Sequence, residues 1–356
     1  MVVEILSRLP PKSLLRFRTV SKSVYTCIGS PRFIRLHTLR SPKKFMIIHQ
    51  ELDTKIIYYS IHSESSYDGI TPFDSPFRCT TTCLVGSCNG ILCFYDRKSR
   101  AIHLWNPAIR RKAIVPDTSD AYGDYCLEFG FGFDMVNDDY KILRTSKQAT
   151  FVYTMKTRTW RQIASPATLY SSATTSHFLF NGSLYRIVEE DLEHNYCRYI
   201  MTFDLSSEVF STIELPLEPS CKASELTSIK GCLAVTYIQV DGDVWIWARN
   251  ATDASWYVAF KLNTHERTTL GDLLFSRYSN GIIVFNPNSG ARSTLAPFNH
   301  SSRILTMITC IESLELLNTG TTCSDDQTNC KTDVDLCKTN KTDDDDLCNL
   351  GCCVIS

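Results

Sequence analysis

The sequence predicts a mainly β protein with a short helical region at its start, a β-propeller of six blades and a disordered tail. Two observations predict the propeller. Between residues 45 and 317, runs typical of β-strands alternate with turn signals such as Asn89-Gly90 and Asn181-Gly182. In addition, one strand of each unit ends in an aromatic residue, at intervals of 40 to 50 residues: Tyr59, Trp105, Tyr153, Phe203, Trp245 and Phe285.

Repeats of this length with several strands each are the signature of a β-propeller. A sandwich of two sheets is the alternative, and the regular spacing favours the ring. Residues 304–311 form a last β-like run, which we expect to complete the first blade. Closure of the ring by this strand would remove exposed sheet edges.

The first forty residues predict three short helices. Pro10-Pro11 ends the first helix, and Pro11 is suited to open the second because an N–H is not needed there. Ser30-Pro31 provides an N-cap and a first residue for the third helix. The apolar residues at helical spacing are Val2, Ile5, Leu6, Leu9, Leu14, Leu15, Phe17, Val20, Val24, Phe33, Ile34 and Leu36. So little apolar mass needs a surface to dock on, either the body of the protein or a partner.

Charge is unevenly distributed along the 356 residues, although the formal net charge is -1. Residues 1–44 contain ten Lys and Arg but one acidic residue, whereas residues 319–356 contain eight Asp and three Lys. This asymmetry indicates a basic docking module, a near-neutral body and an acidic tail. The basic residues interrupt an apolar pattern without interleaved stacking aromatics, so an acidic protein partner is favoured over nucleic acid.

The sequence shows no secretory signal and no apolar run long enough to span a bilayer. We therefore expect a cytoplasmic or nuclear protein whose 16 Cys are mostly reduced thiols. Four of them cluster without a Cys-x-x-Cys pair, which favours buried thiols over zinc ligands: Cys79, Cys83, Cys88 and Cys93. The eight His are scattered, and no catalytic triad or phosphate-binding loop is present. We expect no catalytic residues, no metal and no cofactor.

Residues 3–23 (VEILSRLPPKSLLRFRTVSKS) and 30–37 (SPRFIRLH) closely resemble the plant F-box. The F-box binds the Skp1-type adaptor of a ubiquitin ligase, so the resemblance implies that adaptor, and through it cullin, as partners. Carried over by position, the implied adaptor-binding residues are Leu9, Pro10, Leu14, Leu15, Phe17, Val20 and Lys22. The family pattern also has a preceding Leu-Pro-acid segment and a Trp where this chain has Val24. We therefore expect an N-terminally clipped F-box over residues 1–40.

The body, residues 44–318, resembles the type 1 F-box-associated interaction domain of plants, which implies a kelch-like or galactose-oxidase-like propeller. The matching motifs include residues 86–92 (GSCNGIL), 104–107 (LWNP), 129–133 (FGFGF), 139–141 (DYK) and 152–153 (VY). Residues 180–182 (FNG), 200–204 (IMTFD) and 312–317 (ESLELL) look most like the S-locus F-box branch. That branch recognises pollen–style ribonucleases in self-incompatibility. Three neighbouring tryptophans could line a recognition face, although core packing is favoured: Trp245, Trp247 and Trp256.

Residues 319–356 predict a disordered, acidic, Cys-rich tail, in which KTDVDLC at 331–337 recurs as KTDDDDLC at 341–348. The sequence closes on Cys353-Val-Ile-Ser, which fits a prenylation box. One lipid chain alone binds membranes only marginally, so we expect palmitoylation of Cys352 as a second signal. Membrane attachment through both cysteines is the resulting expectation, and a chance match in a Cys-rich tail is the alternative.

These resemblances imply a non-catalytic substrate-recognition subunit of an SCF (Skp1–cullin–F-box) ubiquitin ligase. The F-box would bind the adaptor, and the β domain would bind a protein target, an S-RNase-like ribonuclease on the finer resemblance, leading to its ubiquitination and degradation. The alternative is a membrane-tethered interaction module that no longer docks to the ligase. A carbohydrate-active or copper propeller enzyme is a distant third reading.

Overall fold

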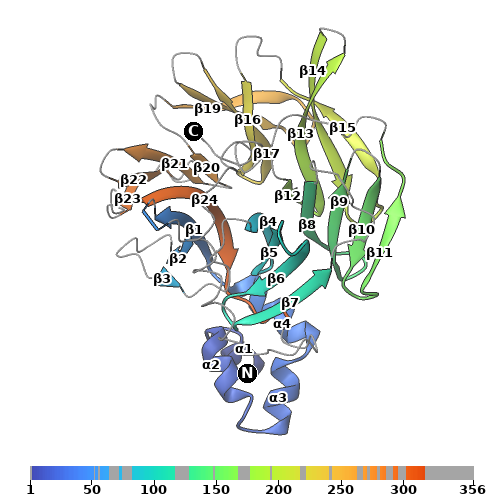
Figure 1. The fold of residues 1–356 in the computed structure, drawn as a ribbon. Coiled ribbons are helices and arrows are strands. Elements are labelled where there is room, and N and C mark those ends of the chain that lie inside the picture. Colours follow the sequence, from blue (N-terminus) through green and yellow to red (C-terminus); the bar gives the residue numbers. More distant parts are fainter. Residues whose placement is uncertain are drawn as a thin grey trace.

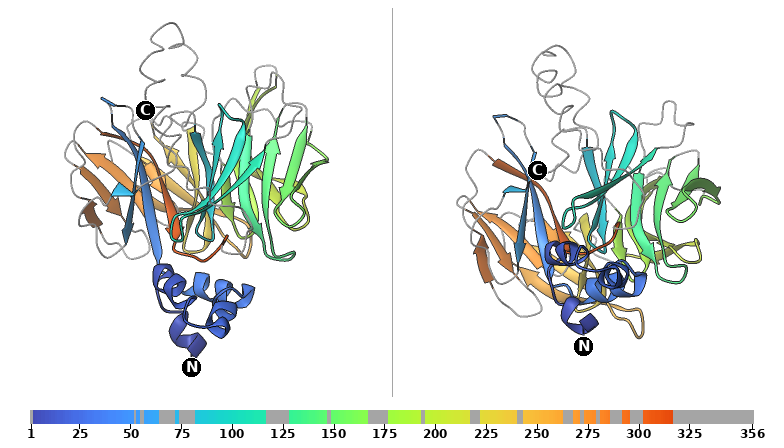
Figure 2. Two further views of the ribbon diagram at one scale, coloured as in Figure 1. Left: turned by 60° about the horizontal axis from the view of Figure 1, so that its bottom comes forward. Right: turned by 90° about the horizontal axis from the view of Figure 1, so that it is seen from below.

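Four helices lie beneath one face of a β domain in the computed structural model of the chain (Figures 1 and 2). The structure describes residues 2–51, 53–54, 57–63, 72–73, 82–116, 128–146, 149–166, 177–192, 195–216, 222–239, 243–262, 268–270, 273–278, 281–285, 292–295 and 302–316. The predicted tail, with Cys352 and Cys353, lies outside these residues. Within them, no helix is both long and apolar enough to cross a membrane.

The helical region contains four helices where the sequence predicted three. They are α1 (Val2–Leu6), α2 (Pro11–Phe17), α3 (Lys22–Ile28) and α4 (Pro31–Arg40). Pro11 opens α2 as predicted, and the Ser30 hydroxyl caps α4 by accepting from the Phe33 N–H at 3.3 Å. The expected second helix is divided because Ser21 starts a new one. Its hydroxyl accepts from the Val24 N–H at 3.2 Å, as an N-cap does.

The β domain consists of six four-stranded antiparallel sheets. The first contains β24 (Ser302–Ile311), β1 (Lys43–Glu51), β2 (Ile57–Ser63) and β3 (Pro72–Phe73). The second contains β4 (Thr82–Cys88), β5 (Ile91–Asp96), β6 (Ala101–Asn106) and β7 (Arg111–Pro116), and the third contains β8 (Glu128–Asp134), β9 (Asp139–Thr145), β10 (Thr150–Thr154) and β11 (Thr159–Ile163).

The remaining three sheets follow the same meander in sequence order. The fourth contains β12 (Phe178–Phe180), β13 (Ser183–Leu192), β14 (Asn195–Asp204) and β15 (Phe210–Glu214). The fifth contains β16 (Lys222–Ile229), β17 (Cys232–Ile238), β18 (Val244–Arg249) and β19 (Trp256–Leu262). The sixth contains β20 (Thr268–Leu270), β21 (Leu273–Tyr278), β22 (Gly281–Phe285) and β23 (Arg292–Leu295).

The sheets follow one another around a closed ring. Their first strands contact one another in the order β24, β4, β8, β12, β16 and β20, and β20 contacts β24 again. The last strand closes the ring because β24 pairs with β1 from Lys43↔Ile311 to Glu51↔Ser302. All six periodic aromatic residues lie on the third strand of their sheet. The predicted mainly-β propeller, closed by its last strand, is confirmed.

The β core is a series of layers between neighbouring sheets. Between the first two sheets, the Tyr59 ring meets the Phe94 and Trp105 rings edge-on, with 6.1 Å between centroids in each pair. Between the fourth and fifth sheets, Ile187 and Val235 are buried against a set of partly buried side chains that includes Trp245, Trp247 and Trp256. The three tryptophans therefore belong to the core, as the sequence favoured.

The FGFGF motif brings the third and fourth sheets close together. A Cβ on Gly130 would lie 2.6 Å from the Leu184 side chain, and one on Gly132 would lie 2.6 Å from the Leu205 side chain. A larger residue at either position would therefore force a leucine side chain to shift. The motif serves packing between blades.

The DYK motif supplies a buried cation to the same junction. Lys141 Nζ lies 2.8 Å from Asp134 Oδ2 and 2.7 Å from Glu208 Oε1, and it donates to the Leu205 carbonyl at 2.6 Å. Burial opposes ionisation of Asp134, but hydrogen bonds from Lys141 and Asn137 outweigh it and lower the pKa of Asp134 to about 2. Three hydrogen-bonded contacts of this kind offset the cost of burying the charges.

The helical domain shares its core with the β domain. Leu14, Ile28 and Phe33 are buried together with Ile109, from the turn between β6 and β7, and with Leu314, which follows β24. An ion pair between Arg35 of α4 and Asp138 of the β8–β9 turn adds a polar contact. The helices therefore dock on the propeller, which supplies the apolar surface that they lack.

Candidate functional site

Apolar side chains are exposed on the helical domain far more densely than elsewhere. Seven of the thirteen exposed large apolar side chains in the described part of the chain lie within its first forty residues: Val2, Val3, Ile5, Phe17, Val20, Tyr25 and Leu39. Val20 is 70% exposed and Ile5 is 58% exposed. Isolated apolar residues at a surface are common, but a concentration of them marks an interaction surface.

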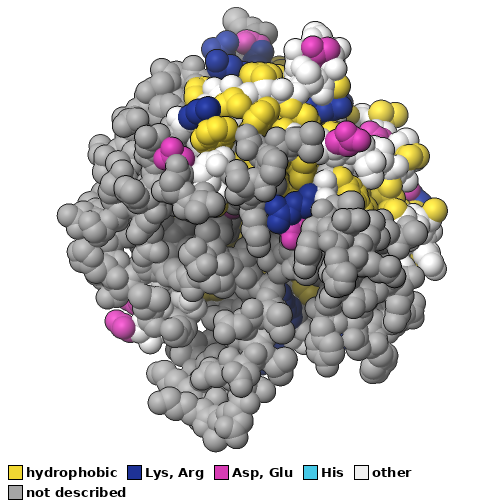
Figure 3. Space-filling model, turned by 90° about the horizontal axis from the view of Figure 1, so that it is seen from above, with side chains coloured by type: hydrophobic (Ala, Val, Ile, Leu, Met, Phe, Trp, Pro, Cys, Tyr) yellow, Lys and Arg dark blue, Asp and Glu magenta, His cyan; other side chains and the backbone are white. Residues whose placement is uncertain are grey.

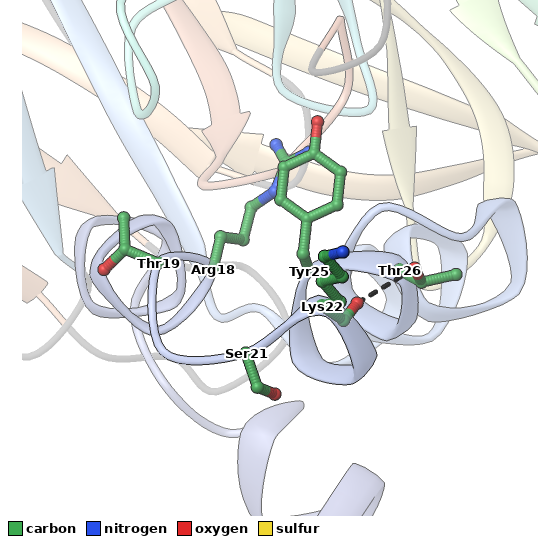
Figure 4. Close-up of a pocket in the computed structure, with 6 residues that line it drawn as sticks. All are labelled: Arg18, Thr19, Ser21, Lys22, Tyr25 and Thr26. Atoms are coloured by element: carbon green, nitrogen blue, oxygen red, sulfur yellow. Dashed lines mark hydrogen bonds between the residues drawn. The ribbon is translucent and has the colours of Figure 1, made fainter.

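A hollow on this domain lies between the end of α2 and the first turns of α3 (Figure 4). The Arg18 guanidinium lies 4.1 Å from the centroid of the Tyr25 ring, within cation–π range. The Thr26 hydroxyl donates to the Lys22 carbonyl at 3.0 Å. The hollow therefore presents an aromatic face beside positive charge.

Positive charge surrounds the exposed apolar side chains. Glu4 pairs with Arg40 and with Arg8, both at 3.0 Å, and hydrogen bonds from these two arginines lower the pKa of Glu4. Four exposed basic residues of the domain make no ion pair with any described residue: Lys12, Arg16, Lys22 and Arg32. The surface is apolar and basic, so it suits an acidic protein with an apolar patch.

The seven residues predicted for this surface divide into two groups. Pro10, Phe17, Val20 and Lys22 are exposed. Leu14 has no exposed surface and packs in the core of the domain. Leu9 and Leu15 are partly buried against the same core.

Sequence reasoning missed other exposed side chains, among them Val3 and Tyr25. In α1, Leu6 is buried whereas Val2 and Ile5 are exposed, although all three were expected on one apolar face. A helix of five residues has one side against the core and leaves its other apolar residues outside. The first forty residues contain more apolar side chains than such short helices can bury. This excess was the signal in the sequence that some of them would be exposed.

The clustered cysteines are structural where they are described. Cys93 is buried, and burial raises the pKa of its thiol well above the usual value. Burial likewise raises the pKa of Cys88 to about 12. No group of three or more His, Cys, Asp or Glu among the described residues could hold a metal ion. Cys79 lies outside the described residues.

The face of the propeller opposite the helices is identified by the turns between strands. Contacts with the helices place the β6–β7 and β8–β9 turns at the helical face, through Ile109 and Asp138. Because the strands are antiparallel, the connections from one sheet to the next leave from the other face. Seen from above, the described part of the surface carries hydrophobic side chains with basic and acidic side chains among them (Figure 3). Between β18 and β19, Lys261 Nζ lies 3.6 Å from the centroid of the Trp245 ring.

The fold and its exposed surface define a helical docking module carried on one face of a β-propeller. Comparison with models of protein families identifies both parts. The F-box domain matches residues 1–36, and the F-box associated beta propeller domain matches residues 44–293. The chain belongs to the F-box proteins with an F-box-associated propeller domain.

Its relatives include three proteins of Arabidopsis thaliana. An F-box/kelch-repeat protein is 26% identical over 72% of this chain and 76% of its own length. An F-box protein is 25% identical over 74% of this chain and 72% of its own length. The F-box protein CPR1 is 26% identical over 73% and 71% of the two chains. Other curated relatives are matched over as little as 57% of their length.

Solved structures share the fold at low sequence identity. The nidogen/laminin complex contains a chain with a TM-score of 0.50 and 12% identity, covering 76% of this chain and 99% of that one. TolB from Acinetobacter baumannii gives a TM-score of 0.50 and 10% identity, covering 82% and 71%. These likenesses concern the fold alone.

Proposed function

We propose that this protein is the substrate-recognition subunit of an SCF ubiquitin ligase. The observation that carries the proposal is the exposed apolar and basic surface on a domain that belongs to the F-box family. A Skp1-type adaptor is the partner that this family implies, and cullin joins through the adaptor. The chain itself supplies binding, with ubiquitin transfer carried out by other subunits.

The adaptor contact centres on Phe17 and Val20 in this proposal. Both side chains are exposed, at 43% and 70%, at the end of α2 and just beyond it, and Lys22 follows at the start of α3. Buried aromatic anchors dominate binding energy at protein interfaces, and charges around them orient the encounter. Leu14, Leu9 and Leu15 support this surface from beneath.

The test is capture of a purified Skp1-type adaptor by the full chain. Phe17→Ala combined with Val20→Ala should weaken capture about tenfold or more, at roughly 1 kcal/mol for each buried anchor. Ile114→Ala is the matched control, because Ile114 is 59% exposed on β7 of the propeller and lies outside the helical domain. Equal capture by the double variant and the wild type would contradict the proposal.

The target would bind at the face of the propeller opposite the F-box. This separation supports the proposal because the two partners then do not compete for one surface. On the finer resemblance, the target is an S-RNase-like ribonuclease, which becomes ubiquitinated and degraded. Binding of such a ribonuclease to the isolated chain, compared with a ribonuclease of unrelated sequence, tests this step. Equal binding of both would exclude the S-locus role.

Attachment to a membrane through Cys353 and Cys352 is a separate proposal that rests on sequence alone. The intact mass of the expressed chain with a free carboxyl terminus tests it, because a farnesyl group adds a defined mass. An unmodified mass, with the chain wholly in the cytoplasmic fraction, would exclude it.

A further inference from the structure

The three most exposed large apolar side chains in the described part of the chain come from the two elements that meet between the domains. Leu39 of α4 is 79% exposed, and Val136 and Met135 of the β8–β9 turn are 77% and 75% exposed. We call these three side chains the bridging patch. None of them contributes to a core of either domain, so their apolar character is left unexplained by folding.

An ion pair brings the two parts of the bridging patch together. Arg35 of α4 pairs with Asp138, which belongs to the same turn as Met135 and Val136. Leu39 lies one helical turn after Arg35, so both side chains are on the same side of α4. The patch therefore extends from the helix to the turn. A concentration of exposed apolar side chains marks an interaction surface, whereas a single one does not.

The turn that carries Met135 and Val136 is held in place by a buried carboxylate. Asp134 Oδ1 accepts from the backbone N–H groups of Val136 and Asn137, both at 3.0 Å, and Lys141 Nζ lies 2.8 Å from Asp134 Oδ2. The exposed side chains thus stand on a backbone that is already ordered. A partner that covers them loses little affinity to ordering of the turn.

Basic side chains border the bridging patch. Arg32 is exposed on the same side of α4 as Arg35. Lys156 of the β10–β11 turn donates to a carbonyl of the β8–β9 turn, and Arg158 of the same turn is exposed. The exposed acid of the β8–β9 turn, Asp138, is already paired with Arg35. A two-fold contact with a second copy would place basic charge against basic charge, so an acidic partner is favoured.

The size of an ordinary interface also favours a contact with both domains. A stable interface takes about 20 to 30 residues from each partner. One side of a domain of four short helices supplies too few of them. Seen from below, the blades extend beyond the helices on both sides (Figure 2). A globular partner that sits on the helices therefore faces the underside of the propeller as well.

We propose that the Skp1-type adaptor binds the bridging patch in addition to α2 and α3, so that its interface includes both domains. The inference rests on the proposed function of the helices as the adaptor-binding domain. Its consequence is that the adaptor holds the propeller in one orientation. A target on the opposite face of the propeller would then be presented to the ligase in a fixed direction.

The test is the affinity of a purified Skp1-type adaptor for the full chain. Met135→Ser combined with Val136→Ser should weaken binding about tenfold, because both apolar contacts are removed. Ile114→Ser combined with Ile238→Ser is the matched control, since it removes two exposed apolar side chains elsewhere on the propeller and should bind like the wild type. All four side chains are exposed, and thermal unfolding checks that both variants are folded.

Oxidation of Met135 gives a second measurement on the unaltered chain. Dilute hydrogen peroxide converts an exposed methionine to its sulfoxide, and mass spectrometry follows this change at Met135. Saturation with the adaptor should slow the oxidation several-fold. An unrelated protein at the same concentration is the control and should leave the rate unchanged.

The outcomes separate this inference from the proposed function. If the wild type does not bind the adaptor, both are overturned. If the wild type and the patch variant bind the adaptor equally well, or if the bound adaptor leaves Met135 oxidation unchanged, the bridging patch is no part of the interface and the proposed function stands. Light scattering of the chain alone covers the remaining occupant. A dimer that the patch variant converts to monomers would make the patch a contact between copies and overturn the inference.

Discussion

At the scale of residues, two turns that share the dipeptide Asn-Gly have different surroundings. Asn89-Gly90 and Asn181-Gly182 both adopt left-handed backbone angles, with φ of +79° at Gly90 and +78° at Gly182. Sequence alone predicts both turns correctly, because Asn-Gly favours this conformation. A Cβ at Gly90, however, would lie 2.5 Å from the Ile311 carbonyl, whereas none of the surrounding atoms lies within 4 Å of one at Gly182. Only the folded chain brings the last strand to the first of these turns.

Alanine at each glycine separates backbone strain from this close approach. Gly182→Ala should lower the free energy of unfolding by about 1 kcal/mol, the cost of a left-handed conformation. Gly90→Ala should cost about 3 kcal/mol, because the backbone of the last strand must also move. Urea denaturation of both variants provides the measurement. A Cβ at Gly90 would also meet the Ser313 side chain. Equal midpoints for the two variants would show that Ile311 and Ser313 move aside without loss of stability.

At the scale of elements, buried charge joins neighbouring sheets. The sequence singled out DYK as a motif but gave no partner for Lys141, because Leu205 and Glu208 lie more than sixty residues further along the chain. The same holds for FGFGF, whose glycines are explained by leucines of the next sheet. These motif residues can thus be recognised from the sequence, whereas their contacts become visible only when neighbouring sheets pack together.

Removal of the buried cation should be far more costly than removal of an exposed one. Lys141→Met leaves Asp134 and Glu208 without this partner and should lower the free energy of unfolding by about 3 to 5 kcal/mol. Arg161→Met removes a half-exposed arginine that pairs with the same Glu208, and it should cost less than about 1 kcal/mol. Thermal unfolding followed by circular dichroism compares the two. A similar loss in both variants would mean that Lys141 is no more important than a surface charge.

At the scale of the whole molecule, the propeller was predictable because its repeats impose a period on the sequence. The aromatic residues of that period occupy one strand position in every sheet, and this regularity arises from local patterning. The junction between domains was not predictable. It depends on Ile109 and Leu314, two side chains about two hundred residues apart, which no local pattern connects. For the same reason, the sequence could not show that Leu14, predicted for the adaptor interface, packs with these two side chains.

The last prediction concerns this dependence of the helical domain on the propeller. Ile109 belongs to a propeller turn and yet is buried in the helical core, with 7% of its surface exposed. Ile109→Ala should therefore loosen the helices by about 2 kcal/mol and leave the sheets intact, because loss of a buried isoleucine costs 2 to 5 kcal/mol. Ile114→Ala, nearby on β7 and 59% exposed, is the matched control and should change nothing. Hydrogen exchange resolved by segment distinguishes the two domains.

A peptide of residues 1–42 should likewise show no cooperative unfolding, since it lacks both Ile109 and Leu314. If that peptide folds by itself, or if the helices of Ile109→Ala keep their protection, the helical domain is independent and the propeller only carries it.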